Sequence, residues 1–176
     1  MSPNLLDPLK VALLVFVAAI LQVTIFSQID ILGGYPDVVL LTLVAIALLR
    51  GSIYGAAAGF FAGLIVDTAN LATLGVTSLL LTIAGYWIGR YGETTGRDRG
   101  HAPFTSVAVI TVLYALGVLI VHFVLGERAP AGEVMRGLLP AIVLNLILTA
   151  PVYALVRRVL RPLDRGDYAT EVRLLG

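Results

Sequence analysis

The sequence contains no cysteine and few charged residues. The absence of cysteine among 176 residues excludes disulfide bonds, haem attachment through thiols and cysteine-based metal sites. Only 13% of the residues are charged and 59% are hydrophobic, whereas soluble domains carry about 25% charged residues. A soluble core could not bury so much apolar surface. The composition therefore indicates an integral membrane protein.

The sequence also lacks the common catalytic motifs. It has no phosphate-binding G-x-x-x-x-G-K-[ST], no G-x-G-x-x-G, no H-E-x-x-H and no G-x-S-x-G. Acid–base or nucleophilic catalysis needs several reactive groups that converge on one place. The two histidines, His101 and His122, fall on opposite sides of the membrane in the topology derived below. We therefore expect no enzymatic activity, no cofactor, no metal site and no nucleic-acid partner.

Long apolar runs occupy most of the chain, and they give six candidate membrane helices at about residues 9–29, 35–49, 53–66, 74–91, 104–125 and 138–160. A helix needs roughly 20 apolar residues to cross the hydrocarbon core, so the second and third are short. The first exceeds the usual signal-peptide core of about 7 to 15 residues and is expected to stay as an anchor. The sequence predicts an all-α integral membrane protein, with six transmembrane helices in one domain over residues 1–162 and a cytoplasmic tail at 163–176.

Lysine and arginine lie mainly in alternate gaps between these runs. Because positive residues hold short loops on the cytoplasmic side, this pattern predicts a multi-pass membrane protein with both termini in the cytoplasm. A re-entrant hairpin of the two short segments would leave Arg50 near the bilayer centre, at about 2.5 to 3.5 kcal/mol, which favours two spanning helices. The residues assigned to the inner side are Lys10, Arg50, Arg90, Arg97, Arg99, Arg157, Arg158, Arg161, Arg165 and Arg173, which leaves Arg128 and Arg136 outside.

A ridge of small residues runs along the third segment. Gly55, Gly59, Gly63 and Asp67 recur every four residues and therefore share one helix face. Small residues at this spacing let membrane helices approach closely. The ridge is expected to serve either packing within the bundle or docking of a partner helix.

Asp67 lies at the C-terminal end of its segment, where the helix dipole disfavours a carboxylate. Two explanations are open. The carboxylate could cap the connection from Thr68 to Gly75 through local hydrogen bonds, or it could pair with a cation. The cation would be Arg128, Arg136 or a residue of a partner.

Several other residues are expected to have structural roles. Pro36 and Asp37 suit the first turn of the second helix, where a proline fits and a carboxylate complements the positive helix end. Asn145 lies between Pro140 and Pro151, which are expected to kink the sixth helix. The amides of Gln22 and Asn145 should hydrogen-bond between helices. Interrupted membrane helices can mark ligand sites, so the region around Asn145 is the best internal candidate for one.

These segments together resemble the rod shape-determining protein MreD family. The resemblance rests on Pro36-Asp37-Val-Val-Leu-Leu, on the glycine ridge from Gly55 to Asp67, on Leu74-Gly75 and on Gly85-Tyr-Trp-Ile-Gly89. It covers most of the chain, because the length and the six-segment layout are similar too. It implies a fold similar to the membrane substrate-binding subunits of energy-coupling-factor transporters.

The resemblance also implies a function. It implies a scaffold, located in the inner membrane, of the bacterial cell-elongation machinery, which synthesises peptidoglycan in rod-shaped cells. The expected partners are MreC, bound through transmembrane helix contacts, and MreB, RodA and a transpeptidase penicillin-binding protein in a larger complex. The alternative is a small-molecule or vitamin-binding subunit of an uptake transporter. Such a subunit should line a cavity with converging polar groups, and the sequence offers few of them within its apolar runs.

The topology can be tested by cysteine labelling in the cysteine-free chain. Single cysteines at Ser2, Gly96, Gly132 and Thr170 should react with an impermeant reagent in intact cells only at position 132, because only this position lies in a loop assigned to the outside. Labelling at position 96 would overturn the assignment.

Overall fold

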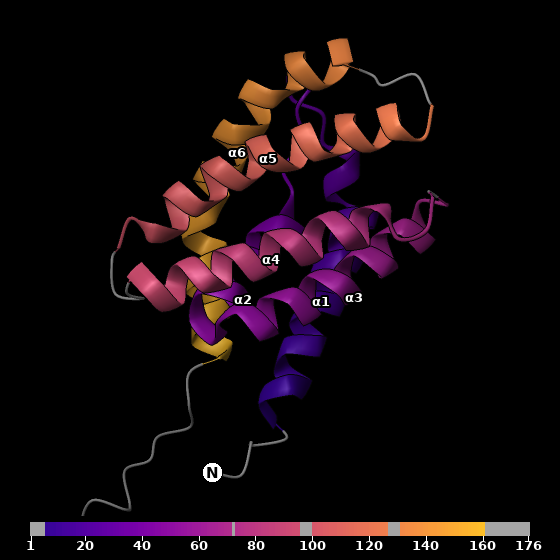
Figure 1. Ribbon diagram of the computed structural model, residues 1–176. Helices are drawn as coiled ribbons and strands as arrows, with labels where there is room; N and C mark the ends of the chain where they lie inside the picture. The colour runs from indigo at the N-terminus through magenta and orange to yellow at the C-terminus, as the bar shows by residue number, and fades with distance from the viewer. Residues whose placement is uncertain (1–5, 72, 96–99, 127–130, 161–176) are drawn as a thin grey trace, which may run out of the picture.

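The computed structural model contains six α-helices and one short 3-10 helix in the described residues, which are 6–71, 73–95, 100–126 and 131–160 (Figure 1). The predicted tail at 163–176 and Arg128 lie outside these ranges. The elements are α1 (Leu6–Thr24), η1 (Phe26–Gln28), α2 (Val38–Arg50), α3 (Ser52–Ala69), α4 (Val76–Thr95), α5 (Ala102–Val124) and α6 (Ala131–Val159). The expected all-helical class is confirmed.

The helices run past several of the apolar runs. α6 begins at Ala131, before the apolar run that starts at Leu138, and α4 continues to Thr95. Charges end an apolar run but do not end a helix, because a helix outside the hydrocarbon core can carry them. α6 also continues as one helix through Pro140 and Pro151.

Four helical stretches in the described chain are long and apolar enough to cross a membrane: α1 with η1, α3, α5 and most of α6. α2 is apolar but has only 13 residues, about 20 Å of helix. The length and composition of the helices therefore show a membrane protein, with four clear candidate spans.

α2 is the centre of the bundle. Every residue from Val38 to Leu48 is buried, and the helix contacts α1, α3, α4, α5 and α6. A helix that is apolar on all sides is expected to be enclosed by other elements. The outer helices expose many large apolar side chains instead, such as Leu13 of α1 and Leu139 of α6. The core of the protein is thus built around α2.

Successive helices run in opposite directions. At one end, Arg50 of α2 hydrogen-bonds to Asp7 of α1 and to the carbonyl of Leu160 after α6. At the other end, Gln22 of α1 hydrogen-bonds to the backbone on both sides of Asp37, where α2 begins. We refer to these as the Arg50 end and the Asp37 end.

Among the described helices, α3 and α4 form the most extensive contact, and the two helices lie side by side in Figure 1. The ridge of α3 faces α4: an added Cβ at Gly55 would overlap the backbone of Gly85, and one at Gly59 would overlap the carbonyl of Leu81. At Gly63 it would overlap the backbone of Ser78. The two backbones are therefore in contact at each of these glycines.

A matched pair of substitutions tests this contact. Gly59→Ala should destabilise the protein by roughly 1–3 kcal/mol, because the backbones must separate to admit a methyl group. Gly132→Ala is the control, since nothing lies within 4 Å of an added Cβ there and alanine favours a helix. Thermal unfolding of both variants in the same detergent measures the difference. Equal stability of the two would show that the packing is looser than described.

Candidate functional site

The N-terminus of α2 is held by side chains from two other helices. The side-chain amide of Gln22 donates to the carbonyl oxygen of Pro36 at 3.2 Å and accepts from the backbone N–H of Val38 at 2.7 Å. Asp37 is the N-cap, and its Oδ1 accepts from the N–H of Leu40 at 2.8 Å. The first N–H groups of a helix have no partner within it, so these bonds satisfy groups that would otherwise be buried without one.

Asn145 completes this arrangement from α6. Its Oδ1 accepts from the backbone N–H of Asp37 at 2.8 Å, and its Nδ2 donates to Oγ1 of Thr111 in α5 at 3.1 Å. The Thr111 hydroxyl then donates to the carbonyl oxygen of Val107 at 2.8 Å. Asn145 is 1% exposed, so its amide joins α2, α5 and α6 in the interior.

Asp67 has the same role for α4. Its carboxylate, in a residue only 1% exposed, accepts from the N–H of Gly75 at 2.8 Å and of Thr77 at 3.3 Å. Gly75 has a φ of +95°, a backbone conformation that favours glycine. The carboxylate that is poorly placed for the dipole of α3 is thus well placed at the positive end of α4. Of the two explanations given for Asp67, the structure contains the local hydrogen bonds to the end of the connection before α4.

The Arg50 end is held by charged side chains. Nη2 of Arg50 donates to Oδ1 of Asp7 at 3.1 Å and to the carbonyl oxygen of Leu160 at 2.6 Å. At the start of α3, Oε1 of Glu93 accepts from the N–H of Ser52 at 2.8 Å and from its hydroxyl at 3.0 Å. Glu93 lies beyond the expected span 74–91, and these hydrogen bonds from Ser52 lower the pKa of its carboxyl. The stabilisation is therefore present above the ordinary carboxyl range and is lost as the pH falls through the lowered pKa.

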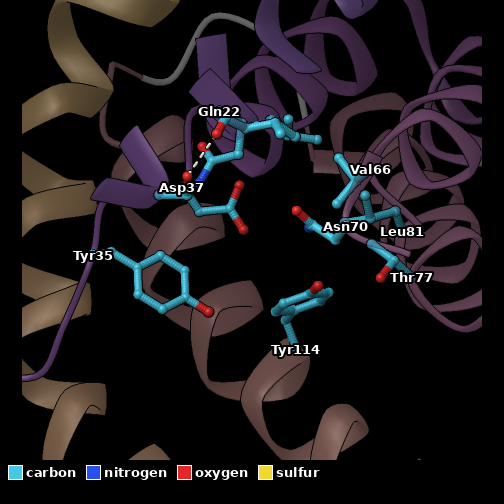
Figure 2. A pocket seen from close by; sticks show the side chains of 11 residues that line it. Gln22, Tyr35, Asp37, Val66, Asn70, Thr77, Leu81 and Tyr114 are labelled. Atoms are coloured by element: carbon cyan, nitrogen blue, oxygen red, sulfur yellow. Dashed lines mark hydrogen bonds between the residues drawn. The ribbon is translucent and has the colours of Figure 1, made fainter. Parts of the chain in front are cut away.

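Two adjoining cavities open beside the start of α2, with volumes of about 200 and 610 Å3. They share Tyr35, Asp37 and Tyr114 as common wall residues. Figure 2 shows the smaller cavity, with the Asp37 carboxylate pointing into the space between the two tyrosines. The other polar residues that line it are Gln22, Ser27, Asn70 and Thr77.

The structure groups the residues singled out in the sequence into two sets. Pro36, Asp37 and Asn145 meet Gln22 at the start of α2, and Pro140 lies close by, against Gly34. The ridge Gly55, Gly59, Gly63 and Asp67 forms the α3–α4 contact together with Gly75. Pro151 is exposed and belongs to neither set.

Several cavity residues were not anticipated from the sequence. Tyr35 lies in the loop before α2, Tyr114 lies in the middle of α5, and Asn70 follows α3. A tyrosine or an asparagine within or beside an apolar run is a weak signal for a ligand site, because each also suits an interface or a turn.

The chemistry of the cavity residues suits binding. One carboxylate, two phenols and several amide or hydroxyl groups can hydrogen-bond to a ligand. In the part of the chain that the structure describes, no group of three or more His, Asp or Glu side chains could hold a metal ion. Small-molecule sites have volumes of about 300 to 1,000 Å3, and the larger part of the cavity lies within this range.

Comparison with known proteins gives one match. The model of a protein family described as rod shape-determining protein MreD matches residues 5–162 of the chain. No curated protein and no solved structure matches it.

Asn145→Leu tests the junction at the start of α2. It leaves the partly buried N–H of Asp37 and the buried hydroxyl of Thr111 without the amide, so the free energy of unfolding should fall by roughly 2–4 kcal/mol. Val143→Leu on the same helix, at a residue 51% exposed, is the control and should change stability little. Thermal unfolding in one detergent compares the two. A stable Asn145→Leu would mean that the junction contributes little.

Proposed function

The chain belongs to the MreD family, and we propose that it is a non-enzymatic membrane scaffold of the bacterial cell-elongation machinery, which binds MreC through transmembrane helix contacts. Family membership gives a role in rod shape determination. The binding of MreC, and the association with MreB, RodA and a transpeptidase penicillin-binding protein during peptidoglycan synthesis, are the finer parts of the proposal.

One observation supports a scaffold most directly. The largest buried polar side chains of the described residues, those of Gln22, Asp67 and Asn145, are bonded to helix ends, and the hydroxyls of Ser78, Thr111 and Thr149 are bonded to helix carbonyls. The outward surfaces of α1, α3, α5 and α6 are largely apolar. A protein of this kind offers helix faces to lipid and to other membrane helices.

We further propose that all six helices span the inner membrane, with both termini in the cytoplasm. The alternating helix directions agree with the predicted distribution of lysine and arginine, which assigns the Arg50 end to the cytoplasm. The shortness of α2 is no obstacle, because other helices enclose it. Irregular backbone beyond its ends is tolerated at membrane depth where protein surrounds it.

The outward face of α3 is our proposed contact for MreC. The inward ridge of Gly55, Gly59 and Gly63 is occupied by α4, so its role is packing. The outward face carries exposed Ile53, Ala57, Phe60 and Phe61, and the two phenylalanine rings meet edge to face with centroids 5.4 Å apart. Large side chains beside a small one form a surface into which a partner helix can pack.

A second candidate function is supported by the cavity at the Asp37 end. More polar groups converge there than the apolar runs suggested, as a small-molecule-binding uptake subunit would require. A gene for MreC beside the gene for this chain favours the scaffold, and a gene for a transporter ATPase favours uptake.

The double substitution Phe60→Ala and Phe61→Ala tests the MreC contact. It removes both rings from the outward face and leaves in place the glycines that face α4, so copurification of MreC from mildly solubilised membranes should fall severalfold. Cells that rely on the variant should lose their rod shape in a complementation assay. The thermal stability of the isolated variant should stay close to that of the wild type.

Trp87→Ala on α4 is the matched control, because Trp87 is an exposed aromatic residue, 66% accessible, on another helix. It should retain MreC. If the α3 variant binds MreC as the wild type does, the contact lies on another helix face.

A further inference from the structure

The cavity at the Asp37 end is built from side chains that are far apart in sequence. Its smaller part, about 200 Å3, is lined by Gln22 from α1, Tyr35 from the loop before α2, Asn70 from the end of α3, Thr77 from α4 and Tyr114 from α5. In Figure 2 these side chains surround an empty centre, and the Asp37 carboxylate points into it. The cap of α2 accounts for Oδ1 of Asp37, which accepts from Leu40, but it does not account for two tyrosines that meet the carboxylate around a hollow.

The electrostatics of this hollow are unbalanced. Asp37 is the only charged residue among the described residues that line the smaller part. The larger part adds Asp30 and Arg136, whose charges are opposite. Among the described residues the ion pairs are Arg50 with Asp7 and Arg90 with Glu93, so Arg136 does not pair with Asp37. The N–H of Leu40 and the positive end of α2 stabilise one side of this carboxylate, and a cation in the cavity would stabilise the other.

The surrounding groups favour an organic cation over a metal ion. Calcium takes six to eight oxygen ligands and magnesium demands near-ideal octahedral geometry, whereas this hollow offers a single carboxylate, and its other oxygens belong to neutral amide, hydroxyl and phenol groups. The rings of Tyr35 and Tyr114 flank the Asp37 carboxylate, and aromatic faces attract ammonium and guanidinium groups. The larger part, about 610 Å3, is lined mainly by apolar residues such as Leu40, Ala115 and Val118, which suit an aliphatic remainder.

We propose that this cavity binds a small organic cation, an amine or a guanidinium, with Asp37 as its counter-ion and with Tyr35 and Tyr114 on either side. The group belongs either to a free small molecule or to a lysine or arginine of a membrane partner, since both present the same chemistry. The inference does not depend on the binding of MreC at α3, and its failure would leave that contact untouched.

The absence of cysteine allows a direct test on the full-length protein in lipid nanodiscs. Thr77→Cys places one thiol inside the cavity, and Thr73→Cys places one on the exposed surface near the same end. The cationic reagent MTSET should react faster than the anionic reagent MTSES at position 77. The ratio of the two rates should be roughly tenfold larger at position 77 than at position 73. Asp37→Asn in the Thr77→Cys background should remove most of this preference. Asparagine can still cap α2, because its side-chain oxygen can accept from Leu40.

Binding itself is measured by protection of the same thiol. n-Butylguanidinium should slow the reaction of Thr77→Cys with uncharged N-ethylmaleimide severalfold, whereas n-butanol at the same concentration should not. The protection should disappear in Asp37→Asn. Equal protection by butanol, no protection by butylguanidinium, or protection that persists in Asp37→Asn would overturn the proposal.

Two further arms complete the test. The Thr77→Cys variant purified with MreC, without added ligand, reports the source of the cation. If MreC alone slows the reaction of the thiol, the cation is a side chain of the partner. If only butylguanidinium slows it, the cation is a free small molecule. If Asp37→Asn does not fold, Tyr114→Leu takes its place. This variant keeps the cap of α2 and should weaken the protection severalfold, and unchanged protection would count against the site.

Discussion

The structure depends on the burial of α2. A short helix enclosed by five others cannot leave its terminal N–H and C=O groups to water, so neighbouring side chains must satisfy them. Gln22, Asp37 and Asn145 do so at one end. At the other end, the arginine of the last turn joins the beginning of α1 to the chain that follows α6. Polar side chains from three other parts of the described chain thus meet where the central helix starts and stops.

The α3–α4 pair follows a different principle, which is contact between two backbones. Glycines on both helices remove the side chains that would keep them apart: an added Cβ at Gly55 would overlap Gly85, and one at Gly85 would overlap Gly55. Dispersion forces act over such a contact, and lipid cannot replace them. Asp67 and Glu93 then satisfy N–H groups at opposite ends of the pair, in α4 and α3 respectively. The pair is thus fixed both along its length and at its ends.

Features that depend on neighbours along the chain could be predicted from the sequence. The apolar runs marked the helices, helix rules placed Pro36 and Asp37 at the start of α2, and the glycine ridge marked a close helix contact. The family resemblance is confirmed by the family model, while the likeness to energy-coupling-factor subunits stays a prediction. The partner of the Asp37 N–H lies 108 residues away, and no local pattern identifies it. The sequence did single out Asn145, which lines the larger cavity, as a candidate for a ligand site. The meeting of Tyr35 and Tyr114 could not be predicted, because it depends on how whole helices pack.

The same contacts have a consequence for biogenesis. The bonds that close the α3–α4 pair join residues at most 41 positions apart, so they can form soon after this hairpin leaves the ribosome. The N–H of Asp37, by contrast, waits for Asn145, which is synthesised more than a hundred residues later. Until α6 is inserted, the start of α2 lacks one of its partners. The order of synthesis thus makes the α3–α4 hairpin an early template and the locking of the central helix a late step of assembly.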